Sequence, residues 1–126
     1  VIPTNNPNKM MIDRLNFFNT VKRVSVFSNQ ASNLVKLNIS DNQLVVSAQD
    51  IDFSISAVER INCEYEGEEI EIGFKSTFLQ EILTNISTSD VKVEMSDPTR
   101  AGLLLPAEND EDEDMLMLLM PMMINV

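Results

Sequence analysis

The sequence predicts an α+β fold built from two similar halves. Hydrophobic residues alternate every second position in several short segments, which is typical of strands, and recur every three or four positions in two others, which is typical of helices. The order strand–helix–strand–strand–strand occurs twice, with a period of roughly 60 residues. Identity between the halves is slight, so the repeat lies in the order of elements. We therefore expect a pseudo-twofold domain with both helices on one face of the sheets.

The first half begins with a strand over residues 9–12 and a helix from Arg14 to about Val26. Asp13 is a favourable N-cap for this helix, because its carboxylate can accept a hydrogen bond from a free backbone N–H of the first turn. At 100° per residue, the hydrophobic residues Met11, Leu15, Phe17, Phe18, Val21 and Val24 share one broad arc. The polar residues Asn16, Asn19, Thr20 and Arg23 occupy the opposite arc.

Three strands are expected to follow. In residues 34–39, Val35, Leu37 and Ile39 share a face, and the alternation resumes in Leu44, Val46 and Ala48 after the turn residues 40–42. In the third strand, Phe53, Ile55 and Ala57 alternate with Ser54 and Ser56. Residues 65–68 are predicted to form a loop.

The second half repeats this order. Ile70 and Ile72 lie on one face of a short strand ending at Gly73, and a helix spans about Ser76 to Ile86. The predicted buried side of that helix consists of Phe78, Leu79, Ile82, Leu83 and Ile86. Further strands are expected over residues 91–95, 101–105 and 115–120.

Composition argues against several kinds of enzyme. The chain has no His and a single cysteine, Cys63, which excludes Ser-His-Asp and Cys-His mechanisms and any disulfide within the chain. Only three glycines are present, which disfavours a nucleotide-binding loop. A small α+β enzyme using Asp50 and Asp52 for acid–base chemistry is the rival hypothesis, but no motif supports it. We expect no catalysis, no metal site and no cofactor.

Charge is distributed unevenly. The net charge is −11, from 9 basic and 20 acidic residues, and six acids lie in residues 108–114. That segment lacks the spacing and the glycine of an EF-hand, so we interpret it as a solvated loop. The first helix is the one clearly basic element, with Arg14, Lys22 and Arg23. Its polar face could simply be solvated, or it could meet phosphates.

Three segments resemble a known family, the C-terminal domain of the bacterial DNA sliding clamp, which is the beta subunit of the replicative polymerase. The first helix, Asp13-Arg14-x-x-Phe17-Phe18-x-x-Val21-x-Arg23-Val24-Ser25-Val26, is similar to that domain's first helix. Glu71-Ile72-Gly73-Phe74, followed by Phe78-Leu79 and Ile82-Leu83, resembles the entry to its second helix. Met120-Pro121-Met122 is similar to the family's terminal Met-Pro-Met. These segments occur in the family's order along nearly the whole chain.

The resemblance implies a single clamp domain over residues 1–126, the third of a three-domain subunit, with residues 1–8 as the linker from the preceding domain. The chain begins at Val1 without an initiator Met, as expected of a piece of a longer protein. Two such subunits would form a homodimeric ring around duplex DNA, without sequence specificity, in the bacterial cytoplasm. The ring would be a processivity factor that tethers polymerases, the clamp loader and repair proteins through their short peptide motifs, without an active site.

The resemblance also assigns roles to residues. A hydrophobic peptide pocket would use Val1, Pro3, Lys75, Phe78, Thr99, Ala101, Leu118, Leu119, Met120, Pro121, Met122 and Met123. Met123 departs from the family, which commonly has a basic residue there. Residues 115–119 fit a buried core strand as well, whereas for residues 120–123 the pocket is favoured. Methionine suits such a pocket, since its flexible side chain adapts to varied apolar partners.

Two further surfaces follow from the resemblance. Arg14, Lys22 and Arg23 would face the DNA, and Val26 and Phe27 would pack against the partner subunit's first domain. Alternatively, Val26 and Phe27 end the first helix inside the core. A general peptide-binding module unrelated to replication is the other functional hypothesis. It would share the methionine-rich pocket, but it would not explain the basic helix or the duplicated pattern.

Overall fold

The computed structural model describes residues 7–29, 31–50, 52–86, 88–97, 99–106 and 117–122. Within these residues the elements are β1 (Asn8–Asp13), α1 (Arg14–Ser25), β2 (Leu34–Ser40), β3 (Gln43–Asp50), β4 (Ile55–Asn62), β5 (Glu64–Glu66), β6 (Ile70–Lys75), α2 (Ser76–Asn85), β7 (Asp90–Met95), β8 (Gly102–Pro106) and β9 (Met117–Leu119). The predicted α+β class and the repeated order of elements are confirmed. The acidic segment 108–114 lies outside the described residues.

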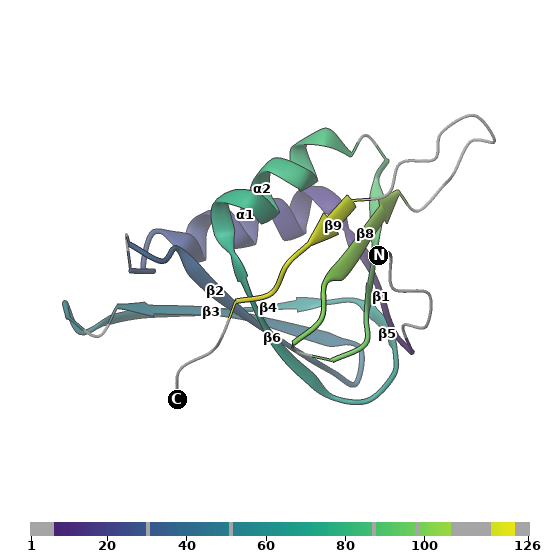
Figure 1. Ribbon diagram of the computed structural model, residues 1–126, viewed down its shortest axis with the longest axis horizontal. Coiled ribbons are helices and arrows are strands. Elements are labelled where there is room, and N and C mark those ends of the chain that lie inside the picture. The colour runs from purple at the N-terminus through teal and green to yellow at the C-terminus, as the bar shows by residue number, and fades with distance from the viewer. Residues whose placement is uncertain are drawn as a thin grey trace.

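The strands form two antiparallel sheets that exchange their first strands. One sheet has the order β5-β1-β7-β8-β9 and the other has the order β4-β3-β2-β6. Thus β1, from the first half, pairs with β7, while β6, from the second half, pairs with β2. The two helices lie side by side against the sheets, as Figure 1 shows. This exchange produces the expected pseudo-twofold arrangement and ties the halves into one unit.

The core lies between the helices and the sheets. The alternation of β2 is fully expressed, since Val35, Leu37 and Ile39 are buried while the residues between them are half-buried. From α1, Phe17 is completely buried, and from α2, Leu83 is as well. Each such side chain contributes about 1.5–3 kcal/mol through burial of apolar surface. The hydrophobic pattern therefore fixes which face of each element turns inward.

Two local predictions are confirmed at the ends of elements. The Asp13 carboxylate accepts a hydrogen bond of 2.7 Å from the Asn16 N–H and so caps α1. Asp41 and Asn42 form the turn between β2 and β3 with φ angles of 49° and 62°. A two-residue hairpin turn of this kind requires left-handed backbone at both positions, which Asp and Asn tolerate better than most residues.

Three local predictions were wrong. The third strand of the first half begins at Ile55, so Phe53 lies in the preceding turn and is 74% exposed. Ser54 adopts a left-handed φ of 54°, which breaks the alternation that the sequence suggested. Tyr65 and Glu66 belong to the edge strand β5 rather than to a loop, because backbone pairing with β1 stabilises a segment too short to show a pattern. Phe78, predicted to face the core, is 53% exposed.

Neither described helix is long and apolar enough to cross a membrane.

Candidate functional site

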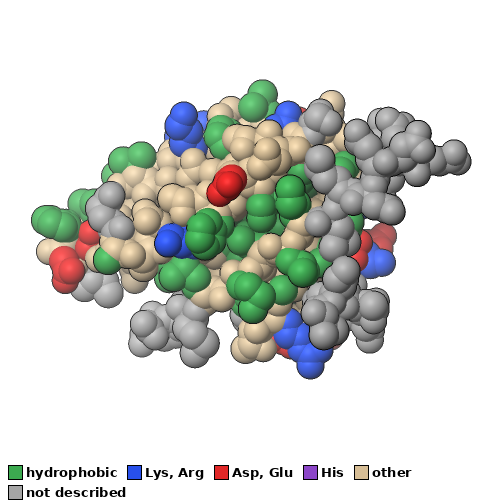
Figure 2. Space-filling view, turned by 45° about the horizontal axis from the view of Figure 1, so that its top comes forward, with side chains coloured by type: hydrophobic (Ala, Val, Ile, Leu, Met, Phe, Trp, Pro, Cys, Tyr) green, Lys and Arg blue, Asp and Glu red, His purple; other side chains and the backbone are tan. Residues whose placement is uncertain are grey.

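A groove of about 450 Å³ opens between α2 and the C-terminal segment of the described chain. One wall comes from α2 and the residue before it, and the other from β9 and the residues after it. The lining residues are Lys75, Phe78, Glu81, Ile82, Leu118, Leu119, Met120, Pro121 and Met122. Figure 2 shows hydrophobic side chains gathered in the middle of the visible face, with charged side chains beside them. The groove is therefore mainly apolar with a charged rim.

The α2 wall follows from helical spacing. Lys75, Phe78 and Ile82 are three or four residues apart, so they project from one side of the helix. Because β6 runs directly into α2, Lys75 occupies the N-cap position, where its side chain makes no capping hydrogen bond. Its ammonium nitrogen instead lies 4.9 Å from the centroid of the Phe78 ring, within the range of a cation–π interaction.

The second wall is positioned by backbone pairing with both sheets. In β9, Leu119 pairs with Gly102 and is buried, whereas its neighbour Leu118 is 43% exposed toward the groove. Beyond β9, the Met122 N–H donates a hydrogen bond of 2.7 Å to the Gly73 carbonyl in β6. The segment thus crosses from one sheet to the other along α2 (Figure 1). This leaves Met120 68% exposed between two fixed points.

The structure brings together seven of the predicted pocket residues. They are Lys75, Phe78, Leu118, Leu119, Met120, Pro121 and Met122. Thr99 and Ala101 do not line the groove; they lie in the connection between β7 and β8. Val1, Pro3 and Met123 lie outside the described residues. Glu81 and Ile82 were not assigned to the pocket, although their spacing of three and four residues from Phe78 could have revealed them.

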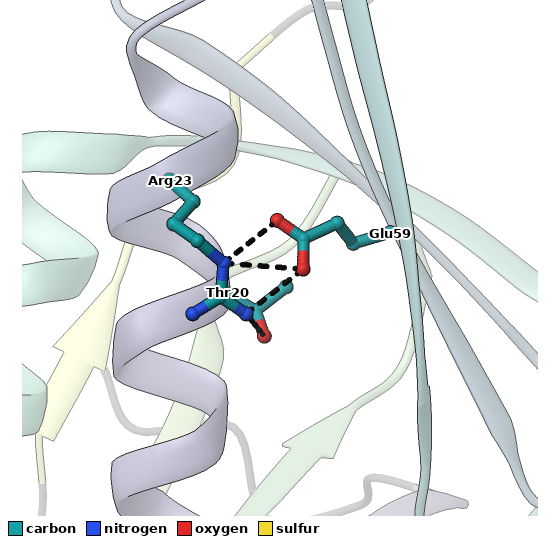
Figure 3. Close-up of polar contacts among 3 residues, drawn as sticks. All are labelled: Thr20, Arg23 and Glu59. Carbon is teal, nitrogen blue, oxygen red and sulfur yellow. Dashed lines mark hydrogen bonds and ion pairs between the residues drawn. The ribbon is translucent and has the colours of Figure 1, made fainter.

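The predicted basic face of α1 contains two arginines with partners inside the domain. The Arg23 guanidinium binds the Glu59 carboxylate of β4, with Nη2–Oε1 and Nε–Oε2 distances of 2.8 and 3.0 Å (Figure 3). This hydrogen-bonded pair lowers the pKa of Glu59 and raises the pKa of Arg23. The Arg14 guanidinium donates to the carbonyls of Leu83 and Thr88, at 3.1 and 2.8 Å.

Lys22 is the exposed basic residue of α1 for which no ion pair forms within the part of the chain that the structure describes. The DNA-facing role of Arg14, Lys22 and Arg23 stays a prediction. At the end of the same helix, Val26 and Phe27 are 67% and 39% exposed. Both side chains therefore reach solvent rather than ending the helix inside the core, and their role in assembly also stays a prediction.

A second, open depression of about 360 Å³ lies elsewhere on the described surface. It is lined by Met11, Ile12, Asp13, Asn62, Cys63, Glu64 and Asp90. Burial raises the pKa of the Cys63 thiol, so its nucleophilic thiolate form is disfavoured at neutral pH. No group of three His, Cys, Asp or Glu residues suited to a metal ion occurs among the described residues. The depression has no geometry that points to chemistry.

The carboxylates of the rival enzyme hypothesis have a structural explanation. Asp50 is buried at the end of β3, and its Oδ1 accepts a hydrogen bond of 3.1 Å from the Asp52 N–H. Asp50 thus organises the turn that leads to β4, whereas Asp52 is exposed in that turn.

The duplicated halves with exchanged strands, the paired helices and the apolar groove beside the last strand are together the features of a sliding-clamp domain. The family model described as DNA polymerase III beta subunit, C-terminal domain, matches residues 1–123. The chain belongs to this family.

Relatives and solved structures agree with that membership. The beta sliding clamp of Haemophilus influenzae is 31% identical over 100 residues, covering 79% of this chain and 26% of the relative. That of Pseudomonas putida is 29% identical over 117 residues, covering 93% of this chain and 32% of the relative. The crystal structure of a sliding clamp from Pseudomonas aeruginosa bound to griselimycin has a TM-score of 0.93 at 28% identity, covering 98% of this chain and 32% of that one. The chain thus spans about a quarter to a third of the length of these proteins.

Proposed function

We propose that this chain is the third domain of a ring-shaped DNA sliding clamp, and that its groove binds the short peptide motifs of polymerases, the clamp loader and repair proteins. The observation that carries the proposal is the apolar groove between α2 and residues 118–122, in a domain of the clamp family. The chain spans a fraction of its relatives, so the ring and its partners belong to a longer protein.

The chemistry of the groove supports peptide binding. Phe78, Leu118 and Met120 each leave a large apolar surface in solvent, which a partner would remove from water. Methionine adapts to different side chains, as a site for many partners requires. The floor is rigid by comparison, because Leu119 is buried and the Met122 N–H is held by Gly73. The groove thus combines a fixed base with adaptable walls.

The remaining surfaces fit a ring. We propose that α1 faces duplex DNA with Lys22 and Arg23, and with Arg14 in a lesser role because its donors are engaged. Phosphate contacts of this kind carry no sequence information, as suits a protein that slides. Val26 and Phe27 would pack on the first domain of the partner subunit in a homodimer, and residues 1–8 would join this domain to the preceding one. We place the assembly in the bacterial cytoplasm and propose that it works by binding, with neither catalysis nor a cofactor.

The experiment that tests the peptide groove uses Met120→Ala and Met122→Ala in the full-length protein. A fluorescent peptide of glutamine, leucines and phenylalanine should bind each variant about five- to tenfold more weakly, because part of a methionine contact is lost. Met11→Ala is the matched control, since Met11 is half-buried and outside the groove. Equal affinities for all four proteins would contradict the proposal.

Light scattering on the same proteins separates docking from assembly. Both methionine variants should remain dimers, whereas Phe27→Asp should shift the protein toward monomer and leave peptide affinity unchanged. A general peptide-binding module would bind the peptide equally well, but the full-length protein would neither dimerise nor remain on circular duplex DNA. That result would favour the second hypothesis.

A further inference from the structure

The groove carries a lysine that has no carboxylate partner among the described residues. The ion pairs formed there are Arg23–Glu59, Lys36–Glu71 and Arg100–Asp97. Lys75 is half-buried, lines the groove, and holds its ammonium nitrogen 4.9 Å from the centre of the Phe78 ring. A positive charge is therefore fixed beside the exposed aromatic surface on which a docked side chain would lie.

The other charged residue of the lining lies farther along the helix. Glu81 follows Lys75 by six residues, which corresponds to about 9 Å along the helix axis. No ion pair joins the two. The lysine lies at the end of the groove where Met122 is joined to Gly73, two residues before it in the sequence. The groove is therefore polarised, with its positive end at the start of α2.

We propose that Lys75 is a specificity-determining residue, which makes the groove select peptides with an acidic side chain next to the hydrophobic residue that packs on Phe78. This inference rests on the proposed peptide-binding function and adds the charge of the preferred ligand. Contact with the ring restricts the lysine before binding, so less side-chain freedom remains to be lost when a carboxylate pairs with it. A docked peptide also removes water from this part of the groove, which strengthens the pair.

Lys75 could instead serve only to cover the Phe78 ring with its aliphatic stem. In that case its replacement would change the affinity of acidic, neutral and basic peptides by the same factor. A charge-reading role changes their ratio, and that ratio decreases with ionic strength. The comparison of peptides therefore distinguishes the two roles.

The experiment uses the full-length protein and a peptide of glutamine, leucines and phenylalanine, in which each position between the hydrophobic residues carries Asp, Asn or Lys in turn. At the position next to the residue on Phe78, the Asp peptide should bind about two- to fivefold more tightly than the Asn peptide, the range for an ion pair near solvent. The Lys peptide should bind more weakly than either. The preference should be lost in Lys75→Gln, retained in Lys75→Arg, and reduced in 1 M salt.

Lys92→Gln is the matched control, because it removes the same charge from an exposed site on β7 outside the groove. It should keep the preference for Asp. Equal binding of Asp and Asn peptides at every position, or a preference that survives Lys75→Gln, would overturn the inference while leaving the groove's function intact. If the wild-type protein bound none of the peptides, the proposed function itself would fail, and this inference with it.

Discussion

Arg14 and Arg23 both belong to α1, and each uses its guanidinium within the domain. Arg23 binds Glu59, which lies 36 positions away in the sequence, and Arg14 binds the carbonyl of Leu83, 69 positions away. Helical periodicity places these arginines on α1 but carries no information about such distant partners. The sequence therefore predicted a basic helix face, and the structure adds that two of its three bases also tie α1 to its neighbours.

Arg14→Ala should destabilise the domain by about 2 kcal/mol, because the carbonyls of Leu83 and Thr88 lose a charged donor and the start of α1 is released from the end of α2. Denaturant unfolding measures the change. Lys22→Ala, at an exposed position on the same helix, should change the free energy of unfolding by less than about 0.5 kcal/mol. Equal losses in the two variants would show that the Arg14 hydrogen bonds do not stabilise the fold.

The Arg23–Glu59 pair should make stability depend on pH. Hydrogen bonding to Arg23 lowers the pKa of Glu59 below its ordinary value of 4.5. Its stabilisation is therefore fully present above pH 4.5 and is lost as the pH falls through the lower folded-state value. The difference in unfolding free energy between wild type and Glu59→Gln should be constant from pH 6 to 8 and should shrink toward pH 3. A difference that stayed constant down to pH 3 would contradict this account.

Elements with strong periodicity could be predicted from the sequence, and elements stabilised by pairing could not. Both helices and the buried face of β2 follow from the spacing of hydrophobic residues. By contrast, β5 has three residues and exists through its pairing with β1. Phe53 was assigned to a strand because it continues the alternation, yet the left-handed Ser54 places it in a turn. Local pattern alone therefore misses short edge strands and the ends of hairpins.

In β9, neighbouring leucines should separate stability from binding. Leu119→Ala should cost about 2–4 kcal/mol of unfolding free energy, because the side chain is buried. Leu118→Ala should cost less than about 1 kcal/mol, since that side chain is 43% exposed, but it should weaken peptide binding in the full-length protein. Denaturant unfolding and peptide titration measure the two quantities. A Leu118 variant that lost stability and kept peptide affinity would reverse the assignment of the two faces.

At the scale of the molecule, the duplicated pattern predicted two halves, but not the exchange of first strands between the two sheets. The groove shows the same limit. Its walls come from residues 75–82 and 118–122, which meet only after β9 joins one sheet and Met122 bridges to the other. Composition suggested an adaptable, methionine-rich surface, and the family resemblance connected it to Lys75 and Phe78. Thr99 and Ala101 came from the resemblance alone, and the structure leaves them outside the groove's lining.

The central claim is that partner peptides dock between α2 and residues 118–122. The most direct test labels the methionine methyl groups of the full-length protein and follows their NMR signals during titration with the peptide of glutamine, leucines and phenylalanine. We expect the signals of Met120 and Met122 to shift with increasing peptide, while the buried Met10 and Met95 stay unchanged. Saturating shifts at other methionines, with Met120 and Met122 unaffected, would contradict the account.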